Sequence, residues 1–274
     1  MVGYKIPGKE KMEKGAIRPW GHITCGGTIS NIEALWSARN LKFYPLALQA
    51  ALKDQKSPLY DARDITVHLP TGESGVLSKL DTWPLLNLKA DDILALPRRL
   101  IEDYKIPADE VTSAVSKYSL HHLGMQKFSR KFLRDIPESS VFLVPGTKHY
   151  SFDKAADLLG IGVENIIDVP VDKNARMDID ALRKKLKCCR EKQRPIYTTV
   201  VVMGSTEEGA VDPIADVLDL REEFRKRGLE FTIHADAAWG GYHASLIRDD
   251  FDMAGSDTIS TWGGVRRPRS DVQG

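Results

Sequence analysis

One carboxylate in this chain stands among unusually small residues. Asp236 ends the apolar run 232–236, and the segment 237–241 that follows contains two alanines and two glycines. The run predicts a β-strand, and ligands of α/β proteins bind beyond the carboxyl ends of their strands. Because residues this small leave the backbone open to close approach, a flat ring could lie here with Asp236 facing it.

A carboxylate that faces a flat ring is typical of enzymes that use pyridoxal phosphate (PLP). The pyridine nitrogen of PLP serves as an electron sink when it is protonated, and a paired carboxylate keeps the proton there. Two other interpretations of His234 and Asp236 stay open at this point. The two side chains could form an ordinary hydrogen-bonded pair at a strand end, or they could be two ligands of a metal ion.

A glycine pair before a predicted helix offers a second kind of chemistry, the binding of an anion. Gly27 and Thr28 precede apolar residues at helical spacing, and Ser30 and Glu33 fit a capping box. Free N–H groups at the start of a helix can cradle a phosphate, with the Thr28 hydroxyl as a further donor. Many helices begin with such a turn, so this segment alone identifies no ligand.

Two more segments run from a strand through a polar loop into a helix. In the segment 144–155 the loop contains His149, whose imidazole could stack on a cofactor ring or could simply lie on the surface. In the segment 200–213 a buried strand run is followed by a turn that contains Thr206 and by a helix that Pro213 starts.

The elements that must position these side chains alternate as a mostly parallel sheet with flanking helices requires. The predicted strands are 141–144, 165–169, 196–203 and 231–234. One predicted helix begins at Asn31, and three others span 152–159, 178–193 and 213–227. Asp178 is the predicted N-cap of its helix, and Gly228 ends the last one. Between the first helix and the first strand, residues 47–132 are expected to be rich in helix and loop.

Taken in this order and at these separations, the four segments resemble the group II PLP-dependent amino-acid decarboxylases. This family includes the glutamate, aromatic amino-acid and tyrosine decarboxylases, and the resemblance is strongest to the tyrosine decarboxylases of bacteria and their fungal relatives. It extends over most of the chain. The longest matching runs are 41–46, 82–88, 147–151, 170–178 and 207–212.

The resemblance implies a homodimeric enzyme of fold type I that converts an L-amino acid, tyrosine or another aromatic one, to the amine and CO2. It also implies that the chain forms the large PLP-binding domain. The implied cofactor-binding positions are Gly27, Thr28, His149, Thr206, Asp236 and Ala238. In the family the first two positions contact the phosphate, His149 stacks on the ring, and Asp236 pairs with the pyridine nitrogen; these last two are the implied catalytic residues. Ala238 corresponds to the small residue packed on the ring.

One family residue is missing. Family members hold PLP as a Schiff base on the lysine of an Asp-Pro-His-Lys motif, which follows a strand resembling 256–260. Here 261–265 replaces the motif, and the lysine position falls at Val265. Valine cannot form an imine, and the last lysine of the chain is Lys226. The chain is therefore expected to be inactive alone.

The ends of the chain also depart from the family pattern. Residues 261–274 lack hydrophobic periodicity and are predicted to be a solvated tail, and residues 1–4 resemble an internal helix of the family. Residues 1–260 are therefore expected to be a partial large domain. An interrupted or aberrantly joined reading frame and a natural pseudoenzyme both remain possible explanations. The functional alternatives are a glutamate decarboxylase or another fold-type I lyase, and a non-catalytic fragment that binds PLP or a full-length subunit.

The composition of the chain argues against several kinds of binding partner and cellular location. The 274 residues are 42% hydrophobic and 28% charged, enough for a sizeable core, and the net charge of +1 argues against nucleic acid or an acidic membrane as partner. Three cysteines form no disulfide framework and no zinc pattern, which favours a reducing compartment, the cytoplasm, and no bound metal. No apolar run is long enough to span a bilayer.

Overall fold

The computed structural model describes residues 21–247 of the chain. Residues 24–236 form one compact unit, and the stretch 237–247, which contains helix α10 (Gly240–Ile247), is described by itself. The predicted strand 256–260, the segment 261–265 with Val265, the predicted tail and residues 1–4 lie outside the described residues.

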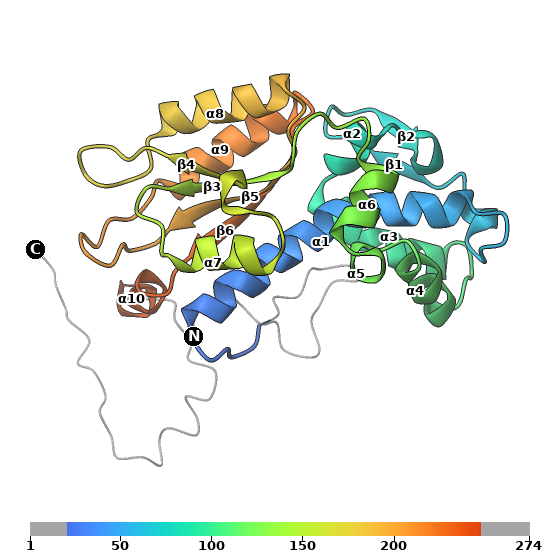
Figure 1. The fold of residues 1–274 in the computed structure, drawn as a ribbon, viewed down its shortest axis with the longest axis horizontal. Helices are drawn as coiled ribbons and strands as arrows, with labels where there is room; N and C mark the ends of the chain where they lie inside the picture. The colour runs from blue at the N-terminus through green and yellow to red at the C-terminus, as the bar shows by residue number, and fades with distance from the viewer. Residues whose placement is uncertain (1–20, 248–274) are drawn as a thin grey trace, which may run out of the picture. The chain divides into compact units, whose positions relative to one another are not determined.

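A parallel four-stranded sheet forms the centre of the compact unit (Figure 1). Its strands lie in the order β4-β3-β5-β6, with bounds β3 Val141–Pro145, β4 Ile166–Val169, β5 Ile196–Val202 and β6 Thr232–Asp236. β3 and β5 are buried along their whole length, which is why both are continuous apolar or threonine-containing runs. The α/β class and the parallel sheet predicted from the sequence are confirmed.

Helices connect successive strands, as parallel pairing demands. They are α7 (Ser151–Leu158), α8 (Ile179–Glu191) and α9 (Ile214–Arg225), each within two residues of its predicted bounds. Asp178 caps α8 as predicted, since its Oδ1 accepts a hydrogen bond from the Ala181 N–H at 3.0 Å. Gly228 follows α9 with a φ of 80°, a left-handed conformation that glycine adopts without strain.

The sheet is covered on both faces (Figure 1). α7 and the long helix α1 (Gly27–Lys53) lie on one face, and α8 and α9 lie on the other. Successive side chains of β3 point to opposite faces of the sheet. Phe142 and Val144 pack in the core that contains α1, and Val141 and Leu143 pack in the core that contains α8 and α9.

The start of α1 corrects one prediction. The helix begins at Gly27, three residues before the predicted cap at Ser30, and its N-cap is Gly26 with a φ of 140° and no side-chain cap. The capping box of Ser30 and Glu33 is therefore wrong. The Ser30 N–H already bonds the Gly26 carbonyl at 3.2 Å within the helix, so it needs no cap, and the Ser30 hydroxyl lies 2.7 Å from Thr24 Oγ1 instead.

After α1 comes a region of short elements that the sequence placed only as helix and loop. It contains the antiparallel hairpin of β1 (Thr66–His68) and β2 (Ser74–Val76), which the sequence analysis did not predict. Its helices are η1 Tyr60–Ala62, η2 Leu77–Lys79, α2 Thr82–Leu86, α3 Ala90–Glu102, α4 Ala108–Ser116, α5 Leu120–Leu123 and α6 Met125–Phe132. A further short helix, η3 (Val163–Asn165), precedes β4. No helix among residues 21–247 is long and apolar enough to cross a membrane.

The run 82–88, one of those that resemble the decarboxylase family, contains a buried residue that connects two segments of the fold. Asn87 is buried at the end of α2, where its Nδ2 donates to the Trp83 carbonyl at 2.9 Å. Its Oδ1 accepts from the Glu230 N–H, also at 2.9 Å. Asn87 therefore ties α2 to the chain that leads into β6.

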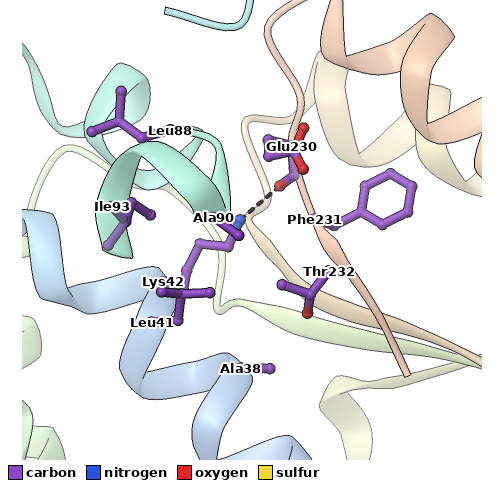
Figure 2. Close-up of a pocket in the computed structure, with 9 residues that line it drawn as sticks. All are labelled: Ala38, Leu41, Lys42, Leu88, Ala90, Ile93, Glu230, Phe231 and Thr232. Atoms are coloured by element: carbon purple, nitrogen blue, oxygen red, sulfur yellow. Dashed lines mark hydrogen bonds between the residues drawn. The ribbon is translucent and has the colours of Figure 1, made fainter. Parts of the chain in front are cut away.

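A buried lysine lies next to this connection. Lys42 on α1 donates from Nζ to the Glu230 carbonyl oxygen at 2.6 Å, inside a small pocket that Figure 2 shows. The Glu230 carboxylate is itself paired with Arg225, Nε to Oε2, at 2.5 Å. Burial lowers the pKa of Lys42 to about 8, and the attraction of Glu230 opposes that change only in part.

The lowered pKa of Lys42 makes the stability of the fold depend on pH. The native lysine releases its proton near pH 8 and the unfolded one near pH 10.5, so the unfolded state binds more protons between these values and the free energy of unfolding rises with pH. Relative to Lys42→Met, the native chain should gain about 2 to 3 kcal/mol from pH 7 to pH 10 in urea unfolding. Lys53→Met, an exposed change on the same helix, should give a flat difference. A flat difference for Lys42→Met as well would contradict the buried cation.

Candidate active site

The strand order marks one place at the carboxyl edge of the sheet where a ligand could bind. β4 lies to one side of β3 and the later strands to the other, so the direction of winding reverses between β3 and β5. Ligands of such sheets bind beyond the carboxyl ends of the strands at this reversal. The loops that follow β3 and β5 contain His149 and Thr206, and Asp236 ends the neighbouring strand β6 opposite Val202.

Asp236 is 9% exposed at the end of β6. Its backbone carbonyl accepts from the Met203 N–H at 2.8 Å, which fixes the strand end against the loop after β5. Its Oδ2 accepts from Nδ2 of Asn31 at 3.0 Å. The predicted carboxylate therefore lies at the expected edge, held from both the strand and helix α1.

Asn31 is a site residue that sequence analysis missed. It is 3% exposed in the second turn of α1, and its amide contacts Asp236, Ser151 and His234. Nδ2 lies 3.0 Å from Ser151 Oγ, and Oδ1 lies 2.8 Å from His234 Nε2. A sequence signal did exist: the asparagine shares helical spacing with the buried Leu35, on a face where a polar residue needs a partner.

His149 is exposed in the loop that leads into α7. Its Nδ1 lies 2.8 Å from Ser151 Oγ and accepts the Ser151 N–H at 3.2 Å, while its ring packs on Tyr150 with centroids 4.1 Å apart. Ser151 is fully buried and also contacts Asn31. The structure thus joins His149 to Asp236 through two side chains.

His234 lies on β6 two residues before Asp236. Burial lowers its pKa, and the nearby Asp236 carboxylate opposes this in part. Both side chains hydrogen-bond to Asn31. Within residues 21–247 no three His, Cys, Asp or Glu side chains are grouped closely enough to hold a metal ion.

The start of α1 supplies the candidate phosphate cradle. Gly27 is exposed and Thr28 half-buried, in the first turn of a 27-residue helix. First-turn N–H groups have no partner within their own helix, and the helix dipole adds partial positive charge at this end. Since Asn31 follows Gly27 by about one turn, the same helix end offers anion-binding groups and contacts Asp236.

The remaining predicted positions are Thr206, Ala238 and Val265. Thr206 is exposed in the turn after β5, and no hydrogen bond within residues 24–236 joins its side chain to Asn31, Ser151 or Asp236. Ala238 lies in the turn between β6 and α10, in the stretch described by itself. Val265 lies outside the described residues.

One buried hydroxyl near His149 has no hydrogen-bond partner among the described residues. It is Oγ1 of Thr147, in the loop after β3. Buried hydroxyls normally find a partner. An unmatched donor in a loop at the reversal of the sheet is consistent with a site that completes its bonding when a ligand binds.

Comparison with known proteins yields a family match. Residues 122–257 match the model of the pyridoxal-dependent decarboxylase conserved domain. The chain is 36% identical to an L-tyrosine decarboxylase of Enterococcus faecalis over 231 residues, 84% of this chain and 31% of the relative. It is 37% identical to an L-tyrosine decarboxylase of Levilactobacillus brevis over 236 residues, 85% of this chain and 31% of that relative. The chain thus spans about a third of the length of these curated relatives.

Among solved structures, mouse CSAD in apo form gives a TM-score of 0.37 at 17% identity, over 80% of this chain and 38% of that one. This likeness is too weak to carry an argument.

Proposed function

We propose that the chain belongs to the family of pyridoxal-dependent decarboxylases and forms the PLP-binding part of an L-amino-acid carboxy-lyase. The reaction would convert the amino acid to its amine and CO2. One observation carries the proposal: Asp236 and His149, the two residues with the clearest cofactor chemistry, are joined by hydrogen bonds through Asn31 and Ser151.

The described residues fit PLP in three respects. A buried carboxylate, Asp236, is available for the pyridine nitrogen. The uncapped start of α1 at Gly27 and Thr28 suits a phosphate. His149 is exposed at the same sheet edge, as a residue that stacks on the ring must be. Thr206 and Ala238 are proposed as further cofactor contacts on family resemblance.

Each residue would have a separate task. PLP, when bound, supplies the electron sink for the carbanion that remains after CO2 leaves. Asp236 would hold the proton on the ring nitrogen, because a carboxylate stabilises the charged pyridinium. His149 would fix the plane of the ring, and the N–H groups around Gly27 would bind the phosphate. Orientation of this kind removes much of the entropic barrier to reaction.

We propose tyrosine or another aromatic L-amino acid as the substrate. Support comes from two of the relatives, both L-tyrosine decarboxylases, and from the resemblance of the run 147–151 to that group. A glutamate decarboxylase or another fold-type I lyase is the alternative within the chemistry. We further propose a homodimer, and the cytoplasm as compartment, in keeping with three free cysteines among the described residues.

The substrate proposal is tested in a chimera that joins residues 1–260 to the part of the Enterococcus faecalis relative that follows its corresponding strand. The chimera should release amine from tyrosine and other aromatic amino acids, and little from glutamate. Replacing its cofactor lysine with valine, the residue that stands at position 265 here, should abolish release. Preferential release of amine from glutamate would refute the aromatic substrate and favour the alternative.

A further inference from the structure

One buried amide connects three distant parts of the chain. Asn31 on α1 bonds Ser151 at the start of α7 and both His234 and Asp236 on β6, partners at least 120 positions away in sequence. The amide has two N–H groups and one carbonyl oxygen, and each has a partner within hydrogen-bond distance. Its orientation is therefore decided by its neighbours.

The carboxylate decides which way the amide faces. An ionised Asp236 can only accept, so the amide nitrogen of Asn31 must face it, and the Asn31 oxygen must face His234. An amide oxygen can only accept, which means that Nε2 of His234 carries a proton. Because burial keeps this histidine neutral, its Nδ1 is then unprotonated.

The second N–H of Asn31 fixes another imidazole. It points at Ser151 Oγ, so the Ser151 hydroxyl is free to donate its own hydrogen to Nδ1 of His149. The Ser151 backbone N–H donates to the same Nδ1, and an N–H cannot reverse its role. Nδ1 of His149 is therefore an acceptor, and the proton of the neutral ring lies on Nε2.

We propose that Asn31 is a positioning residue that sets the proton arrangement of the site: it orients the Asp236 carboxylate and holds His234 and His149 with their protons on Nε2. The inference rests on the proposed function, because the arrangement matters when Asp236 meets a pyridine nitrogen. Loss of Asn31 would remove one hydrogen bond that orients the Asp236 carboxylate and would weaken cofactor binding through Asp236.

Two substitutions separate this role from a general effect on folding. Asn31→Leu removes all three hydrogen bonds. The matched control is Asn40→Leu on the same helix, nine residues or about two and a half turns further on and so on the opposite side.

The test uses the full chain and NMR of its histidine ring nitrogens, with His234 assigned from the spectrum of His234→Gln. In the native chain His234 should show a slowly exchanging Nε2–H resonance and an unprotonated Nδ1. Asn31→Leu should lose that resonance and bind PLP about tenfold more weakly, while Asn40→Leu should change neither.

A native His234 protonated on Nδ1 instead of Nε2 would overturn the proposal without any variant. So would an unchanged Nε2–H resonance of His234 in Asn31→Leu. If the native chain bound no PLP, the proposed function would fail, and the nitrogen spectra would still decide whether Asn31 sets the two tautomers.

Discussion

Replacing Asp236 with alanine is expected to weaken PLP binding by the chain at least about tenfold, since a hydrogen bond to a charged group contributes about 1.5 to 3 kcal/mol. In the lysine-bearing chimera the same change should slow amine release at least about a hundredfold. The physical reason is that Asp236 would be the carboxylate that holds a proton on the ring nitrogen of bound PLP, and alanine cannot replace it. The chain should still fold, with a loss of about 1 to 3 kcal/mol because one buried N–H of Asn31 loses its acceptor.

Binding is measured by titrating the chain with PLP and following cofactor absorbance. Borohydride reduction followed by mass spectrometry should find no stoichiometric adduct on one lysine, because the family resemblance implies that the lysine position falls at Val265. Asp219→Ala, an exposed carboxylate on α9, is the matched control and should bind PLP normally. Native affinity and turnover in Asp236→Ala would mean that the cofactor site lies elsewhere.

Replacing Asp212 with alanine is expected to lower the free energy of unfolding by about 2 to 5 kcal/mol. Asp212 is 3% exposed, and its two carboxylate oxygens accept the N–H groups of Met177 and Val202, each at 2.7 Å. Removing the carboxylate leaves two buried N–H groups unmatched, at a cost of about 1 to 3 kcal/mol each. The effect should be large because one side chain joins the end of β5 to the chain before α8.

Urea unfolding measures this loss, with Asp216→Ala on the exposed side of α9 as the control, expected to stay within about 0.5 kcal/mol of the native chain. Asp212→Asn should lie between the two, because its amide oxygen can still accept one of the N–H groups. A loss below about 1 kcal/mol in Asp212→Ala would show that water replaces the carboxylate easily.

The sheet and its crossover helices could be predicted because their signals are local. The continuous apolar runs of β3 and β5 follow from burial on both faces, and Asp178 lies at the cap position of α8. The start of α1 was misplaced because Ser30 and Glu33 imitate a cap while Gly26 turns the chain. The β1–β2 hairpin was missed because each strand has three residues, too few for a periodic pattern.

Some residues of the candidate site likewise have a local sequence signal, and others do not. Asp236 and His149 could be found from the sequence, since each follows or ends a strand at the edge where parallel strands place their ligands. Asn31 and Ser151 could not, because their importance lies in contacts between segments more than a hundred residues apart. A buried asparagine indicates that a partner exists but not which one.

The central claim is that PLP binds at the carboxyl edge of this sheet. Hydrogen exchange measured by mass spectrometry, with and without PLP, tests it most directly. We expect slower exchange in four segments, 26–31, 146–151, 203–206 and 234–236, and no change in the β1–β2 hairpin. Binding of PLP that left these four segments unchanged, or that slowed exchange elsewhere in the chain instead, would contradict the account.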